Sequence, residues 1–412
     1  MTSLLRWYQN TTGQQAKVLW AALLGWGLDG MDIMLYAFAL TSIQQEFHFT
    51  RAQAGWLAST TLLGSALGGI LFGVIADRYG RVRALIYSIL AYSVFTAATA
   101  TAHSAVELLI WRFLVGLGLG GEWAAGSVLV AEVWEPEHRG KAIGLVQCGW
   151  ALGYMAAAIL ATAIIPSHGW RPLFVVGVAP ALLTWWVRKN IPEPELWRKA
   201  QQEMVPSTIQ VLTRMFAPPY LRTSFYFVVL SSVLMFAYWG LFTWIPTYIS
   251  TSVTAGGAGL SMVKSTPWII SMQVGALFGY TSFGFLSDHF GRRPSFLVFV
   301  LGAALCVPVY ALHATSPRML MLIGPLVGFF GHGYFSVFGA MLAEVFPSML
   351  RATAQGLCYN VGRGISVLAP ATIGFLADRQ GIGVALACTS VLYVLAAGVI
   401  YLLPETKGRS LA

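Results

Sequence analysis

Long apolar stretches separated by short polar segments run through the whole chain. Each stretch holds about twenty residues, the length that a helix needs to cross the hydrocarbon core of a bilayer. A helix is required there because a backbone in lipid must satisfy its own hydrogen bonds. The pattern predicts twelve membrane-spanning helices, at residues 17–40, 53–76, 83–103, 105–131, 142–165, 169–189, 222–249, 262–286, 295–313, 318–344, 352–377 and 381–403.

One polar segment is much longer than the others and leaves six spans on each side. We therefore expect an N-terminal six-helix bundle at 1–189, a linker at 190–221, and a C-terminal six-helix bundle with a short tail at 222–412. The expected fold class is an all-α polytopic membrane protein with twelve transmembrane helices.

Composition supports the same class and excludes several others. Of the 412 residues 57% are hydrophobic and 10% charged, whereas soluble domains carry about 25% charged residues. The net charge of +9 comes from short basic clusters between spans, so we expect no nucleic-acid partner. The four cysteines lack zinc-ligand spacing, and no nucleotide-binding or hydrolytic motif is present. We expect no enzyme activity, cofactor, metal or ATP-driven pumping.

Lysine and arginine are concentrated on one side of the predicted spans. That side holds Arg6, Arg78, Arg81, Arg83, Arg139, Lys141, Arg188, Lys189, Arg198, Lys199, Arg214, Arg292, Arg293, Arg351, Lys407 and Arg409. The opposite side holds Arg51, Arg171, Lys264, Arg318 and Arg379. Because cytoplasmic loops are enriched in positive charge, we expect an inner-membrane protein with both termini and the linker in the cytoplasm.

The two halves repeat one another. Three motifs recur 211 or 212 residues later: Gly73-x3-Asp77-x3-Arg81 as Gly284-x3-Asp288-x3-Arg292, Glu132-x6-Arg139-x4-Gly144 as Glu344-x6-Arg351-x4-Gly356, and Pro192-Glu193 as Pro404-Glu405. An even number of spans in each half gives both repeats the same orientation, as in transporters built from two parallel halves.

These motifs also carry a family resemblance. The run from Gly73 to Arg83 resembles the signature loop of the major facilitator superfamily, and the segments Glu132–Lys141 and Pro404–Arg409 resemble motifs of its sugar-porter and organic-acid branches. Asp29-Gly-Met-Asp32, with Gly121-Glu122 and Trp170-Arg171, is most similar to the sialate/lactate:proton symporter group. The resemblance implies a secondary transporter that works by alternating access.

Charged residues inside a bilayer are costly and therefore candidates for function. Asp29 and Glu122 match in expected depth, as do Asp32 and Arg112, because their two helices run in opposite directions. We predict that these four residues couple transport to protons, and that an Asp32–Arg112 ion pair opens on protonation and frees Arg112 for a substrate carboxylate. The resemblance to sugar porters implies a similar pair. The alternative is a static pair joining two helices.

The expected substrate site adds residues from the second half. Arg363 and Asn360 are three apart on one helical face, so Arg363 is a candidate second contact for an anion, or else pairs with an acidic group. His332 is either a proton relay or a packing residue. The remaining candidates are polar or aromatic residues at the expected cavity depth: Tyr359, Gln147, Trp150, Tyr238, Trp239 and Gln273.

The repeated motifs are assigned a gating role instead of substrate contact. Acidic and basic residues alternate there in both halves, which predicts a cytoplasmic latch that holds the halves together: Asp77, Arg81, Glu132, Arg139, Asp288, Arg292, Glu344 and Arg351. Asp378-Arg379 has the look of the signature loop but falls on the opposite side, so it is set aside.

The favoured function is proton-coupled symport of a small organic anion, such as sialate, a lactate-like monocarboxylate or an aromatic acid, by a monomer in the lipid bilayer. A sugar or polyol porter is the alternative, and a proton-driven drug exporter and a non-transporting sensor come after it.

Overall fold

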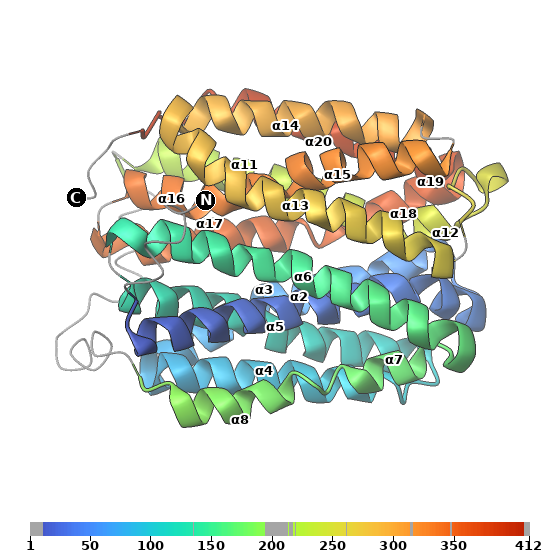
Figure 1. The fold of residues 1–412 in the computed structure, drawn as a ribbon, viewed down its shortest axis with the longest axis horizontal. Helices are drawn as coiled ribbons and strands as arrows, with labels where there is room; N and C mark the ends of the chain where they lie inside the picture. The colour runs from blue at the N-terminus through green and yellow to red at the C-terminus, as the bar shows by residue number, and fades with distance from the viewer. Residues whose placement is uncertain are drawn as a thin grey trace.

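The computed structural model describes residues 11–134, 136–193, 213, 217, 218, 220–260, 262–313, 316–346 and 348–407, in places the backbone alone. The first half contains α2 (Gly13–Phe47), α3 (Arg51–Tyr79), α4 (Arg81–Thr99), α5 (Ala105–Val133), α6 (Pro136–His168), α7 (Arg171–Val176) and α8 (Ala181–Asn190). The second contains α11 (Leu221–Phe242), α12 (Ile245–Ser250), a 3₁₀ turn η1 (Val253–Ala255), α13 (Met262–Phe290), α14 (Arg292–Pro308), a π-helical turn η2 (Val309–His313), α15 (Pro317–Gly333), α16 (Phe335–Val345), α17 (Ser348–Ile365), α18 (Leu368–Gln380), α19 (Ile382–Ala387) and α20 (Thr389–Ile400). Figure 1 shows one bundle of roughly parallel helices.

The twelve predicted spans are confirmed. Within the described ranges, eight helical segments are long and apolar enough to cross a membrane, and a shorter apolar one covers 171–187. Large apolar side chains such as Leu322, Leu305 and Phe278 face outward. An exterior of this kind is stable in lipid, because a soluble monomer does not expose such extensive apolar surface.

Several spans that the sequence pattern predicts as continuous are broken. Three breaks include the residue four positions before a proline: α7 ends at Val176 before Pro180, α11 ends at Phe242 before Pro246, and Ser366 and Val367 separate α17 and α18 before Pro370. Proline has no N–H and its ring clashes with the carbonyl four residues earlier. The freed Phe242 carbonyl accepts a hydrogen bond from the Tyr154 hydroxyl of the first half at 3.2 Å.

Within each half the helices pack mainly with one another, and the halves meet along two seams. In the first half α2 packs on α6, and α5 on α3 and α4; in the second α13 packs on α15, α11 on α17, and α14 on α20. One seam joins α3 to α18 and the other joins α6 to α13. These seams hold the surfaces between which a central site can form.

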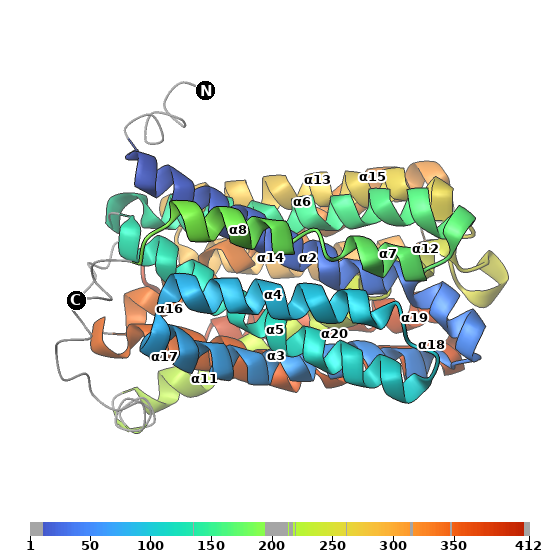
Figure 2. The same cartoon turned by 90° about the horizontal axis from the view of Figure 1, so that it is seen from below.

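The described chain begins and ends at the same end of the bundle, which we call the terminal end. Gln15 near the start of α2 donates to the Val133 carbonyl at the end of α5, at 3.3 Å. Lys407 donates to the His289 carbonyl at the end of α13, at 2.7 Å. Figures 1 and 2 place α16 and α17 at this end, and α7, α12 and α19 at the opposite one, which we call the far end.

Small residues set the closest helix contact of the first half. A Cβ atom at Gly153 of α6 would overlap the Gly27 carbonyl oxygen of α2. We expect Gly153→Ala to lower the free energy of unfolding by about 1–3 kcal/mol, because inserted methyl groups in a packed core force the helices apart. Denaturant unfolding in detergent micelles measures this. Gly398→Ala is the control, since Gly398 faces open space, and an equal loss in both variants would contradict the packing argument.

Candidate functional site

A small cavity lies between the two halves and is lined mainly by aromatic side chains. Its volume is about 30 Å³, room for about two water molecules. The lining residues are Trp26, Gln147 and Trp150 from the first half, and Met235, Tyr238, Trp239, Tyr280, Phe335, Tyr359 and Arg363 from the second. Arg363 is the charged member of this set. The cavity is thus a small aromatic chamber with a cation in its wall.

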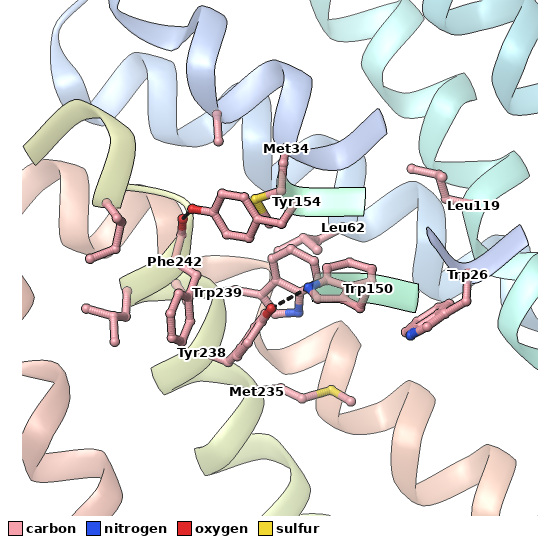
Figure 3. Packing of buried hydrophobic residues seen from close by; sticks show 14 of the residues in the cluster. Trp26, Met34, Leu62, Leu119, Trp150, Tyr154, Met235, Tyr238, Trp239 and Phe242 are labelled. Atoms are coloured by element: carbon pink, nitrogen blue, oxygen red, sulfur yellow. Dashed lines mark hydrogen bonds between the residues drawn. The ribbon is translucent and has the colours of Figure 1, made fainter. Parts of the chain in front are cut away.

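A chain of hydrogen bonds crosses the chamber from one half to the other. The Trp150 indole N–H donates to the Tyr238 hydroxyl at 2.6 Å (Figure 3). That hydroxyl also lies 3.3 Å from His332 Nε2. His332 Nδ1 lies 3.1 Å from the Gly328 carbonyl oxygen. A carbonyl only accepts, so Nδ1 carries the proton, and Nε2 accepts from Tyr238. His332 therefore orients the Tyr238 hydroxyl from behind the chamber wall.

Arg363 also bridges the halves. Its Nη1 donates to the Ser65 hydroxyl of α3 at 2.7 Å, and its Nη2 donates to the Tyr359 hydroxyl at 3.4 Å. The guanidinium carbon lies 5.1 Å from the centre of the Tyr359 ring. Its Nε has no hydrogen-bond partner within the described part of the chain. The side chain is 3% exposed, so it presents a desolvated cation with donor capacity left.

Two buried carboxyl groups lie within electrostatic reach of Arg363. They belong to Asp29 of α2 and Glu122 of α5, each 1% exposed. Asp29 Oδ1 and Glu122 Oε2 have no hydrogen-bond partner among the described residues. The other Glu122 oxygen lies against Gly25, where a Cβ would overlap it. Glycine at this position therefore makes room for a buried acid.

The predicted Asp32–Arg112 ion pair is absent from this conformation. Neither Asp32 oxygen has a hydrogen-bond partner among the described residues, although Arg112 is close enough to act on its charge. Arg112 Nε donates to the Thr61 hydroxyl at 3.1 Å, and its guanidinium carbon lies 4.9 Å from the Tyr36 ring centre. Matching depth did not determine which way the two side chains turn. Arg112 also does not line the chamber.

The other predicted residues divide into two groups. The chamber wall contains Gln147, Trp150, Tyr238, Trp239, Tyr359 and Arg363. Asn360 lies instead against Gly69 of α3, and Gln273 is fully buried with no partner for its amide among the described residues.

Five residues near the site were missed by the sequence analysis. Trp26 and Met235 precede Asp29 and Tyr238 by three positions, so helical periodicity could have found them. Trp26 donates to Gln147 Oε1 at 2.9 Å. Tyr280 and Phe335 lie in apolar runs that give no such signal. Tyr92 is also buried, its hydroxyl has no hydrogen-bond partner among the described residues, and it lies within electrostatic reach of Asp29, Asp32 and Glu122.

Two gate residues, Arg292 and Glu344, join helices of the same half. Arg292 of α14 and Glu344 of α16 form a two-pronged salt bridge, with Nη2–Oε1 at 2.7 Å and Nε–Oε2 at 3.2 Å. The sequence pattern predicts a latch that holds the two halves together. The Arg292–Glu344 pair instead lies within one half. Arg81 is partly buried, and the side chains of the other gate residues lie outside the described part: Asp77, Glu132, Arg139, Asp288 and Arg351.

The repeated Pro-Glu pairs cap two helices. Glu193 accepts from the backbone N–H groups of Val82 and Arg83 at the start of α4, both at 3.1 Å. Glu405 accepts from Arg292 and Arg293 at the start of α14, at 2.9 and 3.0 Å. A carboxylate is favoured at a helix N-terminus. Burial acts to raise the pKa of Glu405, but the backbone donors outweigh it and hold that pKa below its usual range.

We expect Glu344→Gln to lower the free energy of unfolding by about 1–3 kcal/mol, because it weakens a pair of charged hydrogen bonds. Both side chains of this pair are only 12% exposed, so water replaces the contact poorly. The exposed Glu46–Arg171 pair serves as control, and Glu46→Gln should cost less than about 1 kcal/mol. Denaturant unfolding of both variants measures these changes. An equal decrease in the free energy of unfolding in the two variants would contradict a stabilising role for the Arg292–Glu344 pair.

Two family models match the chain. The one described as Major Facilitator Superfamily covers residues 22–283, and the one described as Sugar (and other) transporter covers residues 194–412. A putative metabolite transport protein of Haemophilus influenzae is 37% identical over 96% of this chain and 97% of its own length. The cis,cis-muconate transport protein of Acinetobacter baylyi is 34% identical over 92% of this chain and 91% of its own.

A solved structure has the same fold. The xylose transporter of E. coli, in a partially occluded inward-open conformation, matches with a TM-score of 0.77 and 19% identity, over 97% of this chain and 100% of that one. The twelve spans, the paired halves, the chamber between them and the family match agree with one another. The chain belongs to the major facilitator superfamily, whose members are membrane transporters and not enzymes.

Proposed function

We propose that this protein carries a small organic acid across the membrane in symport with protons. The observation that supports this most is the aromatic chamber between the halves, with Arg363 in its wall and two buried carboxyl groups within reach of that arginine, each with one oxygen that has no hydrogen-bond partner among the described residues. The chamber supplies recognition of an anion, and the carboxyl groups supply the proton sites.

The chamber favours a planar or conjugated acid. Guanidinium groups bind carboxylates through parallel hydrogen bonds, and the surrounding rings offer flat faces for stacking. A relative named for muconate supports an organic anion of this kind. At about 30 Å³ the chamber is too small for such a molecule, so the walls must separate to admit it and close again afterwards.

Substrate binding is coupled to proton binding because Arg363 interacts with both the substrate site and the carboxyl groups of Asp29 and Glu122. With the chamber empty, its positive charge stabilises the anionic forms of Asp29 and Glu122. A bound substrate carboxylate neutralises that charge, and a buried carboxylate without a partner is then more stable with a proton. Substrate binding and proton uptake thus favour each other, as linkage requires. Release of either on the opposite side promotes release of the other.

We further propose how the protein sits and moves. The terminal end faces the cytoplasm of the inner membrane, in accord with the excess of lysine and arginine there. Residues 1–189 and 222–412 rock as two bundles about the linker 190–221, and the monomer is the working unit. The seams between α3 and α18 and between α6 and α13 then open in turn.

The experiment is uptake into liposomes under an imposed pH gradient. Purified protein is tested with labelled muconate, benzoate, sialate, lactate and xylose. Accumulation of acids driven by acid outside, with xylose inert, is the expected result. Accumulation of xylose alone would favour the sugar porter, to which the match of residues 194–412 to the sugar transporter model also points. Export of the acids under the same gradient would contradict symport.

A further inference from the structure

A third occurrence of the signature sequence, after those at Gly73 and Gly284, lies at the far end of the bundle. Gly374-Phe-Leu-Ala-Asp378-Arg-Gln-Gly381 matches Gly73-Val-Ile-Ala-Asp-Arg-Tyr-Gly80 at five of eight positions. Both segments end a helix on a glycine with positive φ, 118° at Gly80 and 86° at Gly381, and the next helix begins at once. This copy falls outside the repeat of 211 or 212 residues, and it ends α18 at the opposite side of the membrane from α3.

Asp378 binds the start of a helix that belongs to the other half. Its Oδ1 accepts from the backbone N–H of Arg51 at 3.1 Å, and its Oδ2 accepts from that of Ala52 at 3.0 Å. These are the first two residues of α3, whose N–H groups have no partner within their own helix. A carboxylate there also interacts favourably with the positive end of the helix dipole.

Arg51 of α3 in turn forms a hydrogen bond with α18. Its guanidinium Nη1 donates to the Ala377 carbonyl at 2.9 Å, in the last turn of α18. The contacts between the two helix ends are therefore reciprocal. The Asp378 carboxylate of α18 lies at the start of α3, and the Arg51 guanidinium of α3 lies at the end of α18. Both contacts join residues more than three hundred positions apart, one in each half.

Close backbone approach holds these helices in register. A Cβ at Gly374 would overlap the Arg51 carbonyl oxygen, and a Cβ at Gly55 would overlap the backbone of Pro370. An open pocket of about 330 Å³ adjoins the contact, with Arg51 and Asp378 among its lining residues. Water can therefore enter at the far side and replace these hydrogen bonds when the halves separate.

We propose that Gly374–Gly381 is a latch that holds the far end closed, and that it releases when the far end opens. The three hydrogen bonds between this segment and Arg51 or Ala52 each have one partner in each half, so none of them survives separation of α3 from α18. The segment that the sequence analysis set aside thus does at the far end what the signature loop is expected to do at the terminal end. This inference rests on the two-bundle motion of the proposed function.

The test measures closure of the far end without substrate. Thr162 of α6 and Thr266 of α13 are hydrogen-bonded across the second seam. In a background with Cys148, Cys306, Cys358 and Cys388 replaced, Thr162→Cys with Thr266→Cys forms a disulfide under mild oxidant when that end is closed. We expect Asp378→Asn to slow disulfide formation by on the order of tenfold, because charged hydrogen bonds are lost.

Two further variants keep the result interpretable. Glu46→Gln breaks an ion pair at the same end of the first half, with Arg171, and should leave the rate unchanged. Arg51→Met removes the bond to Ala377 but keeps the backbone of α3, and should slow the reaction if Asp378→Asn does not fold. An unchanged rate in folded Asp378→Asn, or an equal decrease in Glu46→Gln, would overturn the latch. Disulfide formation is measured without substrate, and uptake of substrate is measured separately. Failure of the proposed transport reaction would therefore not change the outcome of the latch test.

Discussion

Replacement of Arg363 by glutamine is expected to reduce uptake of an organic anion by on the order of a hundredfold, since two hydrogen bonds from a charged donor are lost. Arg363 is the cation in the chamber wall, and its Nε is unpartnered among the described residues. The measurement is initial uptake of labelled acid into liposomes, with substrate concentration varied so that KM and maximal rate are separated.

Two companion variants identify the cause of the loss. Arg363→Lys keeps the charge but removes the planar pair of donors, so uptake should be intermediate. Arg222→Gln removes an arginine that is exposed at the start of α11 and lies against Tyr226, and uptake should be unchanged. Full uptake by Arg363→Gln, with normal folding, would remove Arg363 from the binding site.

Glu122→Gln is expected to abolish pH-driven accumulation while exchange of internal for external substrate continues. A pH difference of one unit is worth about 1.4 kcal/mol per proton, which corresponds to about tenfold accumulation. Glutamine keeps the size of the side chain but carries no exchangeable charge, so the accumulation ratio should fall from about ten to about one. Exchange does not require proton release and should persist.

Variants of the other buried acidic residues test which carboxyl group carries the proton. Asp29→Asn tests the partner of Glu122 within reach of Arg363, and Asp32→Asn tests the group beside Arg112. Normal accumulation in both Glu122→Gln and Asp29→Asn, with loss in Asp32→Asn alone, would contradict coupling through Arg363. It would favour the Asp32–Arg112 switch that the sequence pattern suggested.

The sequence predicts one part of the site better than another. Gln147, Trp150, Tyr238, Trp239, Tyr359 and Arg363 line the chamber because polar or aromatic residues at mid-membrane depth turn away from lipid. Depth alone does not fix the rotation of a side chain about its helix, so Asp32 and Arg112 share a height but make no direct contact. Tyr280 and Phe335 lie in uniformly apolar runs, where only packing selects the residues that face the chamber.

The sequence by itself determined the twelve spans, the pairing of the halves and the set of charges inside the bilayer. Lipid leaves a chain this apolar no alternative to helices of spanning length, and repeated motifs are visible without a structure. The tertiary structure decided the Arg292–Glu344 pair within one half and the contact of Asp378 with α3. Each depends on which helix ends meet in space, and residues hundreds of positions apart are brought together only by packing of the two halves.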